Sequence, residues 1–180
     1  MKIILYGDSI LKRLGKEAVL TLESYVPNST VYNCSTGGFD TRDGLRRAEL
    51  IAQLPIDVVV LCFGMNDAAP WKPVELSQFK ENMIDMVRIF GVSRTILLVP
   101  PSVNESLQEG EGIRNNGILN LYIEVIEGLA RDMGCVCVNP NSALTASGTM
   151  VHLDDGVHLN EAGERILLSV LGGVLTKFQS

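Results

Sequence analysis

Five short apolar runs, separated by segments that contain small and polar clusters, constrain the fold of this chain more than any other feature. The runs occupy residues 3–6, 30–33, 58–62, 95–99 and 136–139 and are rich in Val, Ile and Leu. In the segments between them, apolar residues recur at helical spacing. Short, continuously apolar strands are typical of a sheet that is buried on both faces. The alternation therefore predicts an α/β fold with a parallel sheet and helices on both of its faces.

Apolar side chains three or four residues apart mark the expected helices. The first stripe contains Leu11, Leu14 and Ala18, which predicts one helix after the first strand. The last helix is expected to begin after Asn160, whose side chain can cap it. The longest irregular stretch is 100–115, and a long loop in a small domain is often functional.

Composition narrows the class of protein. A length of 180 residues suits a single domain, 1–180, with one sizeable core. The net charge of −6 and the absence of a basic run exclude nucleic acid as an expected partner. No apolar stretch approaches membrane-spanning length, so no stable membrane association is expected. The four cysteines form no C-x-x-C pair and no secretory segment is visible, which favours a cytoplasmic protein with reduced thiols.

The clusters that follow the expected strands hold the residues that could take part in catalysis or binding. They are 7–9 after the first strand, 35–38 after the second, 64–67 after the third and 152–158 after the fifth. In an open parallel sheet the carboxyl ends of the strands lie along one edge, where ligands bind. Residues scattered over the chain are therefore expected to converge on one crevice.

Ser9, His158 and Asp155 form the candidate catalytic set within these clusters. A serine hydroxyl is a weak nucleophile and needs an adjacent base. Of the two histidines in the chain, His152 and His158, only His158 lies three residues after a carboxylate that could fix its tautomer, Asp155. Ser9 lies on a strand-to-helix turn, where free backbone N–H groups can stabilise an oxyanion.

Each of these residues has a simpler interpretation when taken alone. Ser9 could merely cap a helix, and an isolated His158 could be structural. The 152–158 segment also offers Asp154, Asp155 and the two histidines as metal ligands. The joint arrangement favours the catalytic set, because several coincidences would otherwise have to fall on one sheet edge. A G-x-S-x-G elbow is missing from the sequence, which argues against the common α/β-hydrolase fold.

At these residues the chain resembles the GDSL-type, or SGNH, hydrolase family over nearly its whole length. The blocks appear in the family's order: Gly7-Asp8-Ser9, a glycine after the second strand, Gly64-x-Asn66-Asp67 and Asp155-x-x-His158. The resemblance implies a three-layer α/β/α, flavodoxin-like domain with five parallel strands. It also implies a Ser-His-Asp triad and no metal or organic cofactor.

The resemblance further implies an oxyanion hole with three donors. These are the N–H of the nucleophile Ser9, the N–H of the block-two glycine and the side-chain amide of Asn66. Gly38 is the favoured glycine, because the family often has a glycine just before a short polar turn. Asp40 then falls one position later than usual, so Gly37 remains open.

The function expected from these residues is hydrolysis of a small-molecule acyl ester through a serine acyl-enzyme, as in an esterase, lipase or acylhydrolase. Within the family, a thioesterase or a carbohydrate deacetylase is an alternative. Outside enzymes, a non-catalytic small-molecule-binding module on a flavodoxin-like scaffold is the alternative. Met65 and Trp71 are expected to bind substrate beside the 100–115 loop. This loop is too polar to grip lipid, so short uncharged acyl groups are expected to be preferred.

Overall fold

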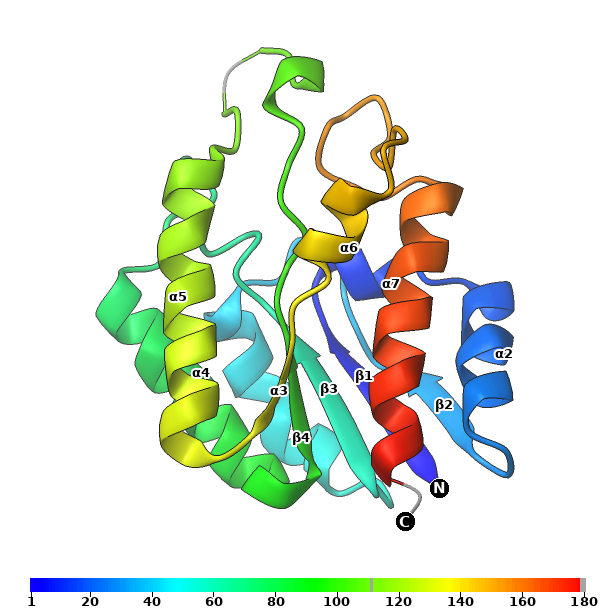
Figure 1. The fold of residues 1–180 in the computed structure, drawn as a ribbon. Coiled ribbons are helices and arrows are strands. Elements are labelled where there is room, and N and C mark those ends of the chain that lie inside the picture. The colour runs from blue at the N-terminus through cyan, green and yellow to red at the C-terminus, as the bar shows by residue number, and fades with distance from the viewer. Residues whose placement is uncertain (111, 179–180) are drawn as a thin grey trace.

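The sheet of this protein is fully parallel and has the strand order β2-β1-β3-β4-β5 (Figure 1). The structure is a computed structural model that describes residues 1–110 and 112–178. It confirms the predicted three-layer, flavodoxin-like fold, with strands close to the five apolar runs. The strands are β1 (Lys2–Gly7), β2 (Thr30–Asn33), β3 (Val58–Cys62), β4 (Thr95–Leu98) and β5 (Val136–Val138).

Helices cover both faces of the sheet (Figure 1). On one face, α2 (Lys16–Tyr25) packs beside α7 (Glu161–Leu175). On the other, α3 (Thr41–Ala52), α4 (Leu76–Phe90) and α5 (Asn116–Met133) lie side by side. The remaining elements are short: the helices α1 (Ser9–Lys12) and α6 (Asn141–Ala146) and the 3₁₀ turns η1 (Val92–Arg94), η2 (Glu105–Leu107) and η3 (Thr176–Phe178).

The central position of β1 and β3 in the sheet explains why their sequences are continuously apolar. All five residues of β3 are buried, as are five of the six in β1. At the end of β1, the Tyr6 ring meets Phe63 edge-on at 5.7 Å and Phe90 at 5.8 Å, and its hydroxyl donates to the Gly44 carbonyl at 2.6 Å. The hydroxyl thus has a partner in the core, as a buried polar group requires.

The chain after β1 departs from the sequence prediction. One helix was expected across Leu11, Leu14 and Ala18, but α1 ends at Lys12 and α2 begins four residues later. Gly15 is the N-cap of α2 in an extended conformation, with φ −77° and ψ −168°, and so breaks the helical path. The single turn of α1 can therefore take its own direction from the end of β1. At the far end of the chain, the predicted Asn160 cap of α7 is confirmed.

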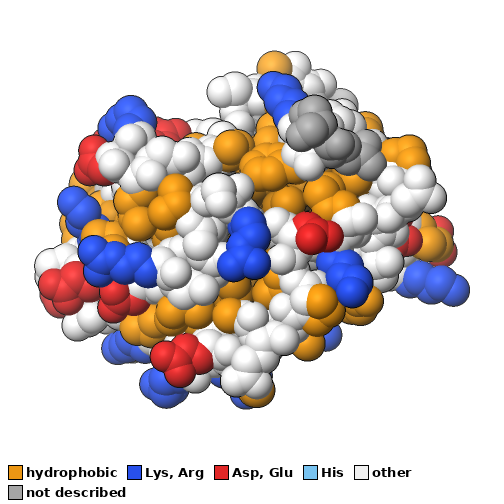
Figure 2. All heavy atoms as spheres, turned by 90° about the horizontal axis from the view of Figure 1, so that it is seen from below, with side chains coloured by type: hydrophobic (Ala, Val, Ile, Leu, Met, Phe, Trp, Pro, Cys, Tyr) orange, Lys and Arg blue, Asp and Glu red, His pale blue; other side chains and the backbone are white. Residues whose placement is uncertain are grey.

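The segments that follow β4 and β5 rise from the upper edge of the sheet in Figure 1. The opposite end of the molecule, shown in Figure 2, exposes patches of apolar side chains among Lys, Arg, Asp and Glu. No helix within residues 1–110 and 112–178 combines the length and the apolar character that crossing a bilayer requires.

A buried carboxylate, Asp67, joins two of the loops at the upper edge. Its Oδ1 accepts hydrogen bonds from the backbone N–H of Thr41 at 2.9 Å and from the Thr41 hydroxyl. Its Oδ2 accepts from the N–H of Gly64 at 3.1 Å. Thr41 begins α3 after the β2 loop, whereas Gly64 follows β3. Asp67 therefore holds the loop after β3 against the loop after β2.

A second buried carboxylate, Asp8, lies directly before the candidate nucleophile. Its Oδ1 accepts from the Ile10 N–H at 2.9 Å and caps α1, while its Oδ2 has no hydrogen-bond partner in the described part of the chain. Burial raises the pKa of Asp8 to about 7, and the nearby Asp67 carboxylate adds to the rise. Burial likewise raises the pKa of Asp67 to about 6. Both side chains therefore bind a proton more readily in the folded state.

The contact between α2 and α7 can be tested with two neighbouring glycines. A Cβ on Gly172 would lie 2.5 Å from the ring of Tyr25, at atoms close to the root of that side chain, whereas a Cβ on Gly173 would meet nothing within 4 Å. Gly172→Ala should therefore lower the free energy of unfolding by about 1–3 kcal/mol. Gly173→Ala should raise it by roughly 0.5–1 kcal/mol, because alanine favours the helix. Urea unfolding measures the change in unfolding free energy of each variant. A Gly172→Ala protein as stable as wild type would contradict the tight contact between α2 and α7.

The raised pKa of Asp8 predicts how stability depends on pH. An unfolded aspartate ionises near pH 4, whereas folded Asp8 ionises near pH 7, so this residue makes stability fall as pH rises between about 4 and about 7. Asp8→Asn keeps the Oδ1 acceptor and cannot ionise. The loss of unfolding free energy between pH 5 and pH 8 should therefore be smaller in Asp8→Asn than in wild type. Asp67 contributes with the same sign and remains, so part of the dependence persists.

The matched control for this prediction is Asp154→Asn, which changes an exposed carboxylate in the same way. Its urea unfolding should show the wild-type difference between the two pH values. Equal pH dependence in Asp8→Asn and wild type would mean that Asp8 is ionised in the folded protein.

Candidate active site

Ser9, His158 and Asp155 form one hydrogen-bonded line at the upper edge of the sheet. His158 Nε2 lies 2.8 Å from Ser9 Oγ, and His158 Nδ1 lies 2.6 Å from Asp155 Oδ2. Ser9 is the first residue of α1 and follows β1, whereas the other two residues lie in the turn before α7. The structure thus brings together the three residues that the sequence analysis selected. Each ring nitrogen of the histidine has one partner, as a base oriented by a carboxylate requires.

The turn at Asp155 holds its carboxylate firmly. Oδ1 accepts hydrogen bonds from the backbone N–H groups of Val157 and His158, both at 2.9 Å, which leaves Oδ2 for the imidazole ring. Burial alone would raise the pKa of Asp155, but the hydrogen bonds from the His158 side chain and from the two N–H groups outweigh it. They lower the pKa to about 2. Asp155 is therefore ionised at neutral pH and can orient the imidazole and stabilise its protonated form.

Gly156 lets residues 104–108 of the loop after β4 pack directly on this turn. The residue has φ +67°, and a Cβ there would lie 2.3 Å from the carbonyl oxygen of Asn104. The Gly156 carbonyl accepts a hydrogen bond from the Asn104 N–H at 2.7 Å. A side chain at this position would therefore separate the loop from the turn that carries the histidine.

The second histidine, His152, lies apart from the serine. Its Nε2 is 2.7 Å from the carbonyl oxygen of Ser102, an acceptor, so the ring donates a hydrogen bond that secures the loop. His152 also forms a bridge with Leu159 across the turn. Among residues 1–110 and 112–178, no group of three or more His, Cys, Asp and Glu side chains is arranged to hold a metal ion.

The candidate oxyanion donors come from three loops. As the first residue of α1, Ser9 has an N–H without an acceptor in that helix. After β2, the turn at 37–38 places Gly37 beside the serine, with its Cβ position 3.9 Å from Ser9 Cβ, and Gly38 has φ +79°. Within the described chain, neither glycine N–H donates to a protein acceptor. After β3, Asn66 donates from Nδ2 to the Phe39 carbonyl at 2.9 Å, which ties its loop to the glycine turn.

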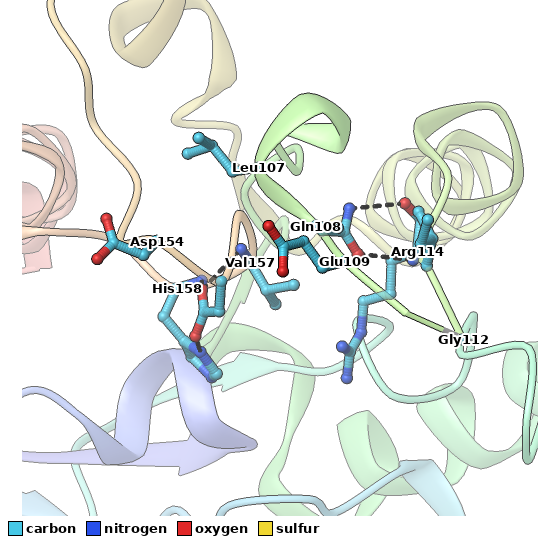
Figure 3. Close-up of a pocket in the computed structure, with 10 residues that line it drawn as sticks. Leu107, Gln108, Glu109, Gly112, Arg114, Asp154, Val157 and His158 are labelled. Atoms are coloured by element: carbon cyan, nitrogen blue, oxygen red, sulfur yellow. Dashed lines mark hydrogen bonds and ion pairs between the residues drawn. The ribbon is translucent and has the colours of Figure 1, made fainter.

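An open pocket of about 460 Å³ lies between the loop after β4 and the turn before α7. Figure 3 shows His158 and Arg114 on opposite sides of it, with both side chains directed toward the strands. Six of the ten lining residues carry polar or charged side chains, and the apolar ones are interspersed among them along the wall. The lining residues are Leu107, Gln108, Glu109, Gly112, Ile113, Arg114, Asp154, Asp155, Val157 and His158.

Trp71 and Met65, the two residues expected to bind substrate, differ in exposure to solvent. Trp71 is 54% exposed and lies next to Gly112 of the pocket wall, where a Cβ would approach its ring to 2.8 Å. Met65 has no exposed side-chain surface and belongs to the core, so its predicted contact with substrate does not fit the structure. Adjacency to Asn66 in the sequence says nothing about where a side chain points, and the apolar thioether of Met65 turns inward.

Arg114 is the site residue that the sequence analysis missed. Its guanidinium lies 4.7 Å above the ring of Trp71, donates from Nε to the Met65 carbonyl at 3.2 Å and donates from Nη2 to Asn66 Oδ1 at 3.0 Å. Burial lowers the pKa of Arg114, while the negative charges of Asp8 and Asp155 oppose that shift. The guanidinium is thus a cation that reaches from the pocket wall to a candidate oxyanion donor. No local motif marks it, because a lone arginine in a polar loop is usually solvated.

Comparison with solved structures finds the same fold in several bacterial enzymes. A lipase/acylhydrolase from Enterococcus faecalis has a TM-score of 0.88 and 23% identity, with 98% of this chain and 95% of that chain covered. A member of the lipolytic G-D-S-L family from Veillonella parvula has a TM-score of 0.79 and 18% identity, with 98% of each chain covered. An acetylxylan esterase from Geobacillus stearothermophilus has a TM-score of 0.75 and 23% identity, with 94% and 91% covered.

Comparisons of the sequence with curated proteins and with family models identify the family of this chain. No similar sequence is found among curated proteins. The model of the GDSL-like Lipase/Acylhydrolase family, in contrast, matches residues 5–166, which contain all four blocks singled out above. Because this match spans most of the chain, the protein belongs to the GDSL-like lipase/acylhydrolase family of carboxylic ester hydrolases.

Proposed function

We propose that this protein hydrolyses carboxylic esters of small acyl groups through an acyl-enzyme formed on Ser9. The observation that carries the proposal is the unbroken line from Asp155 Oδ2 through the His158 ring to Ser9 Oγ, at 2.6 and 2.8 Å. Both distances lie within the range in which a base can take a proton from a nucleophile. Family membership supports the reaction class.

In the first half of the proposed reaction, His158 Nε2 takes the hydroxyl proton while Ser9 Oγ bonds to the acyl carbon. The carbonyl oxygen becomes an oxyanion and accepts hydrogen bonds from the Ser9 N–H, from the N–H of Gly38 or Gly37 in the 37–38 turn and from Asn66 Nδ2. Asp155 stays ionised and stabilises the imidazolium. His158 then returns the proton to the departing alkoxide, which leaves as an alcohol.

In the second half, water takes the place of the alcohol. His158 accepts a proton from this water as its oxygen bonds to the acyl carbon, and the same donors hold the second oxyanion. Collapse of that intermediate breaks the bond to Ser9 Oγ, which recovers its proton from the imidazolium. The products are the free acid and the regenerated enzyme.

The preference for small acyl groups rests on the pocket. It is open, and among its lining residues Gln108, Glu109, Arg114 and Asp154 present polar or charged groups. A long acyl chain would need a contiguous apolar surface in place of these groups. One similar structure is named as an acetylxylan esterase, which is consistent with a two-carbon acyl group.

A non-catalytic binding module on the same scaffold is the alternative outside enzymes. It would have no use for a serine hydroxyl hydrogen-bonded to a histidine that is itself oriented by a carboxylate. An organophosphonate separates the two functions, because only an activated serine displaces its leaving group. Mass spectrometry should locate the adduct on Ser9, and no adduct should form on the Ser9→Ala protein.

The triad assignment predicts a contrast between the two histidines. Ser9→Ala and His158→Ala should each lower kcat by roughly 10⁴-fold or more, because the parts of a triad act as a unit. His152→Ala should keep kcat within about tenfold of wild type, because its ring only donates to the Ser102 carbonyl. The measurement is hydrolysis of p-nitrophenyl acetate, with circular dichroism to verify folding. A well-folded Ser9→Ala protein with normal turnover would reject the mechanism.

The pocket predicts a ranking of substrates. In a series of p-nitrophenyl esters from acetate to palmitate, kcat/KM should be highest for acyl groups of roughly two to four carbons, since little apolar surface is available to longer ones. Steady-state kinetics below the micelle-forming concentration of each ester measures this. A maximum at ten carbons or more would contradict the substrate proposal and leave the triad assignment intact.

A further inference from the structure

The orientation of the Asn66 side chain depends on two neighbours of opposite hydrogen-bonding character. Asn66 Oδ1 accepts from Arg114 Nη2 at 3.0 Å, and Asn66 Nδ2 donates to the Phe39 carbonyl at 2.9 Å. A guanidinium can only donate, and a carbonyl can only accept. If the amide were turned by 180°, both hydrogen bonds would be replaced by unfavourable contacts. Arg114 and Phe39 therefore select one of the two orientations.

The selected orientation leaves one amide hydrogen available. Nδ2 carries two hydrogens, and the bond to the Phe39 carbonyl uses one of them. The guanidinium on Oδ1 also withdraws electron density from the amide, which strengthens Nδ2 as a donor. Asn66 is almost fully buried, with 3% of its surface exposed, so water competes little for these groups.

The loop holds Arg114 in place from its backbone outward. The Gln108 side chain accepts from the Arg114 N–H at 2.7 Å and donates to the Arg114 carbonyl at 2.9 Å, as the dashed lines in Figure 3 show. The guanidinium is then fixed by Trp71, which it overlies at 4.7 Å, and by the Met65 carbonyl. Backbone and side chain are both anchored, so the donor to Asn66 has a defined position.

From these contacts we propose that Arg114 is a positioning residue, which holds the Asn66 amide in the orientation that presents Nδ2 to the oxyanion. The inference rests on the proposed function, in which Asn66 is an oxyanion donor. Arg114 acts through Asn66 and takes no part in the proton transfers. Its effect is expected on the transition state, where the oxyanion is formed, more than on substrate binding.

A double-mutant cycle tests this coupling, with kcat and KM measured on p-nitrophenyl acetate. Arg114→Met keeps an unbranched apolar stem near Trp71 and removes both donors. Asn66→Ala should lower kcat on the order of 100-fold, as the loss of one oxyanion donor does. Arg114→Met should lower kcat about tenfold with KM changed less than about threefold. In the Asn66→Ala background, Arg114→Met should change kcat less than about twofold, because no amide is left to orient.

The controls separate positioning from damage to the fold. Arg88→Met removes an exposed arginine of α4 that pairs with Asp85, and it should match wild type in kcat and KM. Where Arg114→Met fails to fold by circular dichroism, the same cycle is run with Arg114→Lys. Lysine keeps the charge, but its single ammonium group cannot donate to the Met65 carbonyl and to Asn66 Oδ1 in the way the planar guanidinium does. Arg114→Lys should therefore lower kcat less than Arg114→Met does, and this loss should again be absent in the Asn66→Ala background.

The outcomes distinguish this inference from the proposed function. Equal losses of kcat from Arg114→Met in both backgrounds, or an effect confined to KM, would overturn the positioning role while the triad stands. An Asn66→Ala protein with unchanged kcat would overturn Asn66 as an oxyanion donor and the inference with it. Normal turnover by folded Ser9→Ala would reject the proposed function itself.

Discussion

The parallel pairing of β1 with β2 on one side and β3 on the other decides where the candidate catalytic groups of this protein lie. Parallel strands end at the same edge, so Ser9 after β1 lies between the 37–38 turn after β2 and Asn66 after β3. The proposed nucleophile is thus flanked by candidate oxyanion donors from two different loops. Hydrogen bonds from Thr41 and Gly64 to Asp67 keep those loops together and offset the cost of burying its carboxylate.

The strands and the proximity of Ser9, His158 and Asp155 could be predicted from patterns in the sequence. A strand buried on both faces must be apolar throughout, so β3 is visible as an unbroken run of five residues. Asp155 and His158 are three residues apart, and a short turn is enough to bring the carboxylate to the ring. Ser9 is distant from both in the sequence. Its proximity to them follows from the parallel sheet, which places the end of β1 and the turn before α7 at one edge.

The other parts of the site depend on tertiary contacts that leave no local pattern. Arg114 meets Asn66 only because the loop after β4 folds back over the strand ends and is closed by Gln108. Met65 was misplaced because its neighbours in the sequence do not determine which way a side chain points from a turn. The break before α2 was missed because Gly15 is compatible with both a helix and a cap, and the apolar stripe continues through it.

The hydrogen bond from the Asn104 N–H to the Gly156 carbonyl links two tasks that are often assigned to separate parts of an enzyme. The segment that forms one wall of the pocket also rests against the turn that holds the imidazole. A change in the length or path of that segment would therefore move the base together with the wall. The shape of the pocket and the position of the proposed base are thus mechanically coupled, so a substitution in one of these two segments is felt by the other.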